Sequence, residues 1–120
     1  MGSGLVKERL ANAKSVDKAA TVYSVSVRSR LSKGYSAVLI SSTAGSIAVS
    51  LQTSLDNVNF YDAVDTDGTA IGGVCSALTV TTGTYIQFPS VVSDYVRFKI
   101  IEGNAAATVV TIDLLFVESV

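Results

Sequence analysis

Valine, isoleucine and threonine make up 36 of the 120 residues, and all but two of them follow Ala20. A branched Cβ restricts the rotamers of a side chain in a helix, but it packs well on the pleated surface of a sheet. A chain of this length is also too short for two independent cores. This distribution predicts one all-β domain over residues 21–120, preceded by a different kind of segment at residues 1–20.

Apolar and polar residues alternate along most of this domain, as they do in strands with one buried face. Alternation is clearest at residues 46–55, where Ile47, Val49, Leu51, Thr53 and Leu55 are expected to face inward. At residues 23–30 it places Tyr23, Val25 and Val27 on one face. Further strands are expected at residues 35–41, 58–62, 77–82, 84–88, 95–100 and 108–118. About eight strands at this spacing predict an antiparallel β-sandwich, either jelly-roll or immunoglobulin-like in its strand order.

Two turns and the last strand carry further information. Asp56-Asn57 joins two of the expected strands, and both residue types suit a tight turn, which predicts a hairpin. Gly103-Asn104 predicts a second turn. The strand at residues 108–118 is apolar on one face and mostly apolar on the other. It is therefore expected to lie in the centre of a sheet or to be covered by a partner.

The charges are segregated along the chain, although the net charge is only -1. Residues 1–33 hold seven of the nine cations and two anions, whereas the remainder holds eight of the ten anions. Such segregation suggests a partner of opposite charge: an acidic protein, another copy of this chain or nucleic acid. A protein partner is favoured over nucleic acid, because the cations are sparse and lack interleaved aromatic residues. The alternative is a basic segment folded against its own domain.

Residues 1–20 are thus expected to be a basic arm, either a short amphipathic helix or an extended segment, that becomes ordered where it docks. The residues of the arm expected to bind a partner are Leu5, Val6, Lys7, Arg9, Leu10, Lys14 and Lys18. A basic strand is expected to add Arg28, Arg30 and Lys33.

The composition argues against an enzyme. Histidine is absent and Cys75 is the single cysteine, which removes the commonest general base, a disulfide and a thiolate zinc cluster. The aspartates at 65 and 67 resemble the start of a calcium loop, but Ser76 stands where such a loop needs glutamate, so a surface turn is expected. We predict no catalytic residue, no metal and no cofactor. The charged start and the lack of a long apolar run predict a soluble, unexported protein.

The segment at residues 50–62 resembles a hairpin of small β-sandwich structural proteins of tailed bacteriophages and prophages. In that family the hairpin reads Gln-x-Ser-x-Asp-Gly-x-x-Trp/Phe, and here it begins at Gln52. Asn57 stands where glycine is usual, and Phe60 where tryptophan is common. The likeness continues through the strand at residues 95–100, a small-residue turn and the last strand, and it covers roughly residues 35–118.

The resemblance implies a non-enzymatic protein of the virion, assembled in the host cytoplasm. Capsid decoration (cement) proteins and neck, tail or fibre components all belong to this group. The expected partners are the capsid or other virion proteins and further copies of the chain, without a membrane. The alternative is a carbohydrate-binding or adhesive module of a tail or fibre, since similar hairpins occur in carbohydrate-binding sandwiches. Its glycan platform is expected at Tyr61, Tyr85 and Tyr95.

Overall fold

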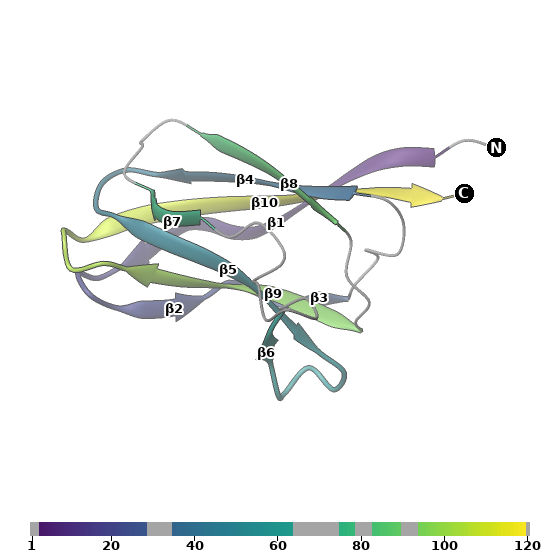
Figure 1. The fold of residues 1–120 in the computed structure, drawn as a ribbon, viewed down its shortest axis with the longest axis horizontal. Helices are drawn as coiled ribbons and strands as arrows, with labels where there is room; N and C mark the ends of the chain where they lie inside the picture. Colours follow the sequence, from purple (N-terminus) through teal and green to yellow (C-terminus); the bar gives the residue numbers. More distant parts are fainter. Residues whose placement is uncertain (1–2, 29–34, 64–74, 79–82, 90–93, 120) are drawn as a thin grey trace.

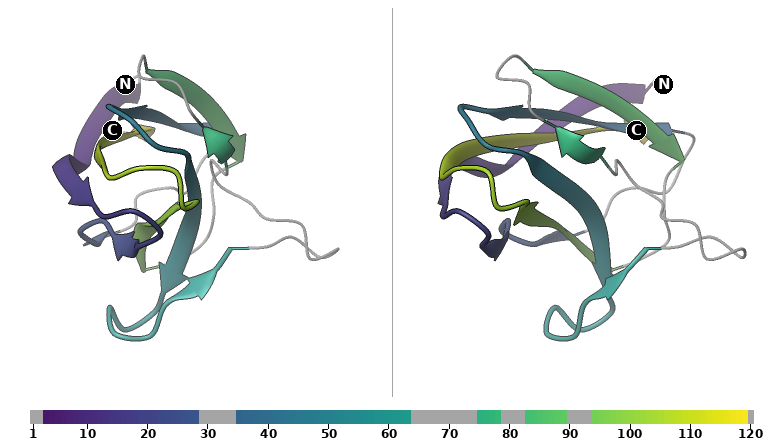
Figure 2. Two further views of the ribbon diagram at one scale, coloured as in Figure 1. Left: turned by 90° about the vertical axis from the view of Figure 1, so that its left-hand side faces the viewer. Right: turned by 60° about the vertical axis from the view of Figure 1, so that its left-hand side comes forward.

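The computed structural model describes residues 3–28, 35–63, 75–78, 83–89 and 94–119, and every regular element among them is a β-strand. In chain order these are β1 (Ser3–Val16), β2 (Thr21–Tyr23), β3 (Val27–Arg28), β4 (Tyr35–Ser42), β5 (Ile47–Ser54), β6 (Tyr61–Asp62), β7 (Cys75–Leu78), β8 (Thr84–Pro89), β9 (Tyr95–Glu102) and β10 (Thr108–Ser119). They form two facing sheets, and both termini lie at the same end of the molecule (Figures 1 and 2). The predicted β-sandwich is confirmed.

The strand order is that of a jelly roll. The first sheet runs β1-β10-β4-β8, and the second runs β2-β9-β5-β6, with β3 also on β9 and β7 also on β5. Strands from the two halves of the chain pair antiparallel: β1 with β10, β2 and β3 with β9, and β4 with β8. The chain is therefore a long ribbon that folds back after β5 and rolls into two sheets. This settles the choice of strand order that the sequence leaves open.

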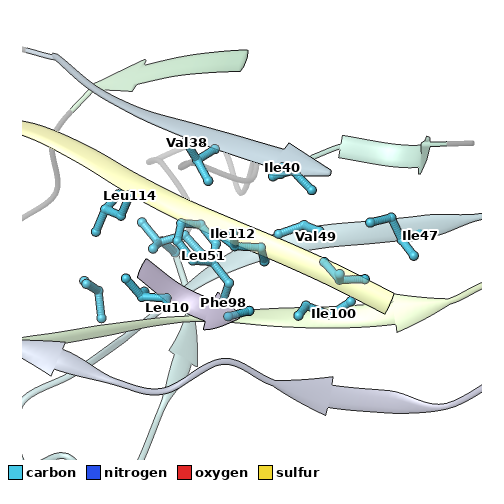
Figure 3. Packing of buried hydrophobic residues seen from close by; sticks show 14 of the residues in the cluster. Leu10, Val38, Ile40, Ile47, Val49, Leu51, Phe98, Ile100, Ile112 and Leu114 are labelled. Atoms are coloured by element: carbon cyan, nitrogen blue, oxygen red, sulfur yellow. The ribbon is translucent and has the colours of Figure 1, made fainter. Parts of the chain in front are cut away.

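The core lies between the two sheets and takes one face of each (Figure 3). The largest fully buried side chains are Leu10, Val16, Val38, Ile40, Ile47, Val49, Leu51, Val96, Phe98, Ile100, Ile112 and Leu114. The alternation predicted for β5 and β9 is confirmed at these positions. The last strand, β10, lies between β1 and β4, so it is central in its sheet, which is one of the two positions that its sequence predicts.

Residues 3–16 do not form a helix or a separate arm. They are the long strand β1, which pairs with β10 from Ser3↔Ser119 to Val16↔Thr108. The register shifts between Arg9 and Ala11 and again between Ala11 and Lys14. These irregularities interrupt the two-residue alternation, so that the apolar residues of a strand acquire a spacing like that of a helix. The boundary drawn at residue 20 therefore does not separate two structural units.

The predicted strand at residues 23–30 is also wrong in part. The chain forms two short strands, β2 and β3, and Val22 rather than Tyr23 packs against the core. Tyr23 and Val25 are exposed. The backbone N–H of Val25 donates to the carbonyl of Leu10 in the first sheet, so this residue has left the ladder with β9. The break between β2 and β3 moves Tyr23 and Val25 off the predicted inward face, whereas Val27 packs against the core as predicted.

One buried carboxylate closes an end of the sandwich. Glu102, at the end of β9, accepts backbone N–H bonds from Ala19 (2.9 Å), Ser46 (3.0 Å) and Ala105 (2.9 Å). These donors belong to the turns after β1, β4 and β9. The hydrogen bonds lower the pKa of Glu102 to about 2. Gly45, with φ +73°, sits against this site, since a Cβ there would lie 2.7 Å from the carbonyl oxygen of Ala106. The site is structural: it ties three turns together.

Candidate functional site

A cluster of aromatic and charged side chains covers the outer face of the second sheet. Its centre is Arg97 of β9, whose guanidinium carbon lies 4.0 Å from the ring centroid of Tyr23 and 4.0 Å from that of Phe60. Two rings at this distance cannot share one face of the guanidinium, so they cover its two faces. We call the group the Arg97 cluster, and it consists of Tyr23, Gln52, Phe60, Asp62, Arg97 and Lys99.

Hydrogen bonds fix the polar members of the Arg97 cluster. Arg97 Nε donates to Gln52 Oε1 at 2.8 Å, and Gln52 Nε2 donates to Asp62 Oδ1 at 3.0 Å. Lys99 Nζ lies 3.3 Å from the other carboxylate oxygen of Asp62. The bond from Gln52 lowers the pKa of Asp62, and Lys99 lowers it further. Asp62 is therefore an anion at neutral pH that is already shared between two donors.

The strands bring these side chains together by alternation. Residues at odd numbers in β9 and even numbers in β5 face away from the core, which places Arg97, Lys99 and Gln52 on one surface. Arg28 joins the same face from β3, with its guanidinium carbon 5.7 Å from the centroid of Tyr95. The sequence indicates that Arg97 and Lys99 face outward. It does not show the cluster, because Tyr23 is expected to face inward and Phe60 comes from the far side of a turn.

The predicted hairpin between β5 and β6 is confirmed, and it projects from the body of the sandwich (Figures 1 and 2). Asp56 organises its turn: Oδ1 accepts the backbone N–H groups of Val58 (2.9 Å) and Asn59 (2.8 Å), and Oδ2 accepts Asn59 Nδ2. These bonds lower the pKa of Asp56 well below its usual range. Asn57 has a positive φ of 61°.

The turn exposes two apolar side chains. Leu55 and Val58 are each 77% exposed, the largest exposed fractions among the large hydrophobic residues of the described chain. We call them the hairpin tip. The hairpin is predicted from the sequence, but the inward position predicted for Leu55 is wrong, because β5 ends at Ser54 and Leu55 lies in the turn.

The predicted partner-binding arm has a structural role in part. Leu10 is buried in the core, and Val6 packs against it, so neither is presented to a partner. Arg9 forms a two-pronged ion pair with Asp113, at 2.8 and 3.0 Å, and lowers the pKa of that buried carboxylate. Leu5 lies within β1, and its side chain is outside the described part.

The remaining predicted basic residues are dispersed. Lys7 and Lys18 are exposed and Lys14 is half-buried, while Arg28 is exposed beside Tyr95. Arg30, Lys33 and the acidic loop at residues 65–69 lie outside the described residues.

The three tyrosines proposed as a glycan platform are not on one surface. Tyr85 belongs to β8 in the first sheet, and it is exposed beside Leu39 on the outer face of that sheet. Tyr61 and Tyr95 belong to the second sheet. Tyr61 is opposite Thr53, on the other side of the hairpin from Phe60 and Asp62. A platform made of all three is therefore wrong.

Within the described ranges, no three histidine, cysteine or acidic side chains lie close enough together to hold a metal ion. The same ranges contain no helix long and apolar enough to cross a membrane.

The sequence matches no protein-family model and no curated protein.

Proposed function

We propose that this chain is a non-enzymatic structural protein of a virion, a capsid decoration protein that binds the assembled particle and neighbouring subunits. The observation that carries the proposal is the projecting hairpin. It is the segment that resembles the phage structural proteins, and it exposes Leu55 and Val58 at its tip. The jelly-roll order adds support by analogy, because viral capsid domains use this architecture, although one fold serves many functions.

The hairpin tip has the physical character of an anchor. Burying an exposed leucine or valine side chain contributes roughly 1.5–3 kcal/mol, so two such side chains can supply much of a specific contact. Binding normally costs the ordering of a loop. Here Asp56 and Ser54 already hold the turn through hydrogen bonds to Asn57, Val58 and Asn59. A decoration protein that binds only the assembled state stabilises it by mass action.

Co-sedimentation with purified virions of the phage or prophage that encodes the chain tests the proposal. We expect the purified protein to pellet with the particles, and the double variant Leu55→Ser, Val58→Ser to lose at least about tenfold in affinity, which corresponds to the loss of one buried anchor. Both positions are exposed, so the variant should retain the wild-type melting temperature.

Tyr85→Ser is the matched control, because Tyr85 is an exposed apolar side chain in the other sheet. It should bind as the wild type does. Failure of the wild type to bind, or full binding by the double variant, would refute attachment through the tip. The proposed contact between copies is tested by light scattering at two protein concentrations. A defined oligomer supports self-association, and a strict monomer contradicts it.

The second candidate function is a carbohydrate-binding or adhesive module of a tail or fibre. The Arg97 cluster favours it, since aromatic rings and fixed hydrogen-bonding groups share one surface there. Lectin domains use the jelly-roll architecture as well. This candidate differs from the first in its partner, a glycan, and in its binding surface, the Arg97 cluster. Variants of the hairpin tip and variants of the Arg97 cluster therefore distinguish the two candidates.

A further inference from the structure

We propose that the Arg97 cluster binds the carboxylate of an acidic glycan, with a sugar ring against Tyr23 and the carboxylate on the outer edge of the Arg97 guanidinium. This inference deepens the second candidate function and names its ligand class. It does not depend on attachment to a virion through the hairpin tip.

The geometry leaves one part of Arg97 available to a ligand. The rings of Tyr23 and Phe60 cover the two faces of the guanidinium, and Gln52 occupies Nε. Within the described part of the chain, no acceptor lies in hydrogen-bond contact with the two Nη groups. These groups lie in one plane, and such an edge fits the two oxygens of a carboxylate with parallel hydrogen bonds.

The arginine is held in place before any ligand arrives. Gln52 is only 7% exposed, and it is itself bound to Asp62. A free arginine side chain loses about 2 kcal/mol of rotamer entropy when it is fixed, and here the rings and Gln52 have already removed that freedom. The fixed guanidinium therefore favours a planar anion, which can form two parallel hydrogen bonds, over an anion that makes only a charge contact.

The charge of this face suits an anion. Arg28, Arg97 and Lys99 are cations on the outer face of the second sheet, and the carboxylate of Asp62 contacts Lys99 among them. Asp62 is bonded to Gln52 and Lys99 and does not occupy the Nη edge of Arg97. The face is thus locally positive in a protein whose net charge is -1.

The surroundings favour a sugar over an acidic peptide. Tyr23 is 42% exposed, so its ring presents an amphipathic surface beside the cation. An extended peptide commonly binds by adding a strand to a free sheet edge. Arg97 is instead in β9, which already has β2 on one side and β5 on the other. A pyranose ring that carries a carboxylate needs no free edge.

Nuclear magnetic resonance titration with a galacturonate trimer tests the proposal, using two matched probes. The methyl ester of the trimer keeps the rings and removes the charges, and a glutamate trimer keeps the charges and removes the rings. We expect the acidic sugar to shift the Arg97 Nε–H and Gln52 side-chain amide signals. Each of the other two probes should bind at least about tenfold more weakly.

Two variants and a control complete the test. Arg97→Lys keeps the charge but loses the planar pair of donors, and it should weaken binding of the acidic sugar at least about tenfold. Tyr23→Leu keeps an apolar contact with Arg97 and removes the ring, so it should also weaken binding of the acidic sugar. This variant tests the proposal if Arg97→Lys fails to fold. Tyr85→Ala, in the other sheet, should change nothing.

The outcomes that would overturn the proposal are distinct. If the acidic sugar shifts no signal of the Arg97 cluster, the proposed site is excluded. If the glutamate trimer binds as tightly as the acidic sugar, the ligand is an acidic peptide and not a glycan. Equal binding of the methyl ester removes the role of the carboxylate. Wild-type affinity in either folded variant shows that the sugar binds elsewhere. None of these results bears on binding to virions through the hairpin tip.

Discussion

At the scale of single residues, Glu102 shows how one buried charge can organise an end of the molecule. A carboxylate has no donor of its own when it is ionised, so it can accept several backbone N–H groups that would otherwise be unpaired in the turns. Ala19 and Ala105 bond to Oε1, and Ser46 bonds to Oε2. An amide at this position would direct its NH₂ group at one of these donors.

We therefore expect Glu102→Gln to lower the melting temperature at pH 7, by roughly 5–10 °C for a domain of this size. The pKa of Glu102 falls from 4.5 to about 2 on folding, so its stabilisation is present above pH 4.5 and is lost as the pH decreases toward 2. Thermal unfolding followed by circular dichroism between pH 7 and pH 2 measures both effects. The difference between wild type and variant should shrink across that interval.

The control for this experiment is Asp94→Asn, which removes an exposed carboxylate outside the three turns. It should follow the pH dependence of the wild type. Asp56, Asp62 and Asp113 also have lowered pKa values, and they remain in both Glu102→Gln and the control. If the difference in melting temperature between the wild type and Glu102→Gln were constant with pH, the stabilisation of the three turns would not depend on the charge of Glu102.

At the scale of elements, the hairpin shows a turn whose conformation its sequence indicates. Asn57 adopts a φ of 61°, a left-handed conformation that asparagine tolerates and glycine adopts without cost. Its side-chain oxygen also accepts a 2.6 Å hydrogen bond from the hydroxyl of Ser26, which fastens the turn to the segment between β2 and β3.

Two substitutions separate the backbone from the side chain at this position. Asn57→Gly should change the free energy of unfolding by no more than about 0.5 kcal/mol, because easier backbone geometry offsets the lost bond to Ser26. Asn57→Val should cost about 2 kcal/mol, since a β-branched residue is strained at positive φ. Urea denaturation measures both, and Gln87→Val in the edge strand β8 is a control that should change little. Equal destabilisation by glycine and valine would show that the side chain governs the turn.

The predictability of the elements follows from how locally each is determined. The apolar residues of β5, β9 and β10 recur at every second position and are buried, so the core-facing side of each strand can be inferred from sequence alone. The burial of Gln52 and Ser54 on the opposite face of β5 cannot. The helix-like spacing in β1 arises from register shifts, which depend on pairing with a strand about a hundred residues away. Tyr23 and Phe60 meet across Arg97 only after the ribbon has rolled up. No local pattern reports such contacts, so the hairpin could be predicted and the Arg97 cluster could not.

At the scale of the whole molecule, the rolled ribbon makes the two ends of the chain depend on each other. β1 is an edge strand of the first sheet, next to β10, and it contributes Leu10, Ala11 and Val16 to the core. Three of the cations at the start of the chain, Lys7, Arg9 and Lys14, therefore lie on a strand of the sandwich. Charged side chains on an edge strand also discourage pairing with other sheets.

Removal of residues 1–16 should consequently unfold the domain. If these residues were a separate arm, their removal would leave the domain folded. Full burial of Leu10 and Val16 alone contributes roughly 3–6 kcal/mol, which is comparable with the total stability of a small domain. The deletion would also expose one side of β10 and leave Asp113 without Arg9. We expect the truncated chain to lose the dispersed amide spectrum of the full chain, whereas removal of Met1 and Gly2 should preserve it. A truncated chain with a native-like spectrum would mean that β1 is a detachable segment after all, able to leave its own sheet and dock on a neighbour.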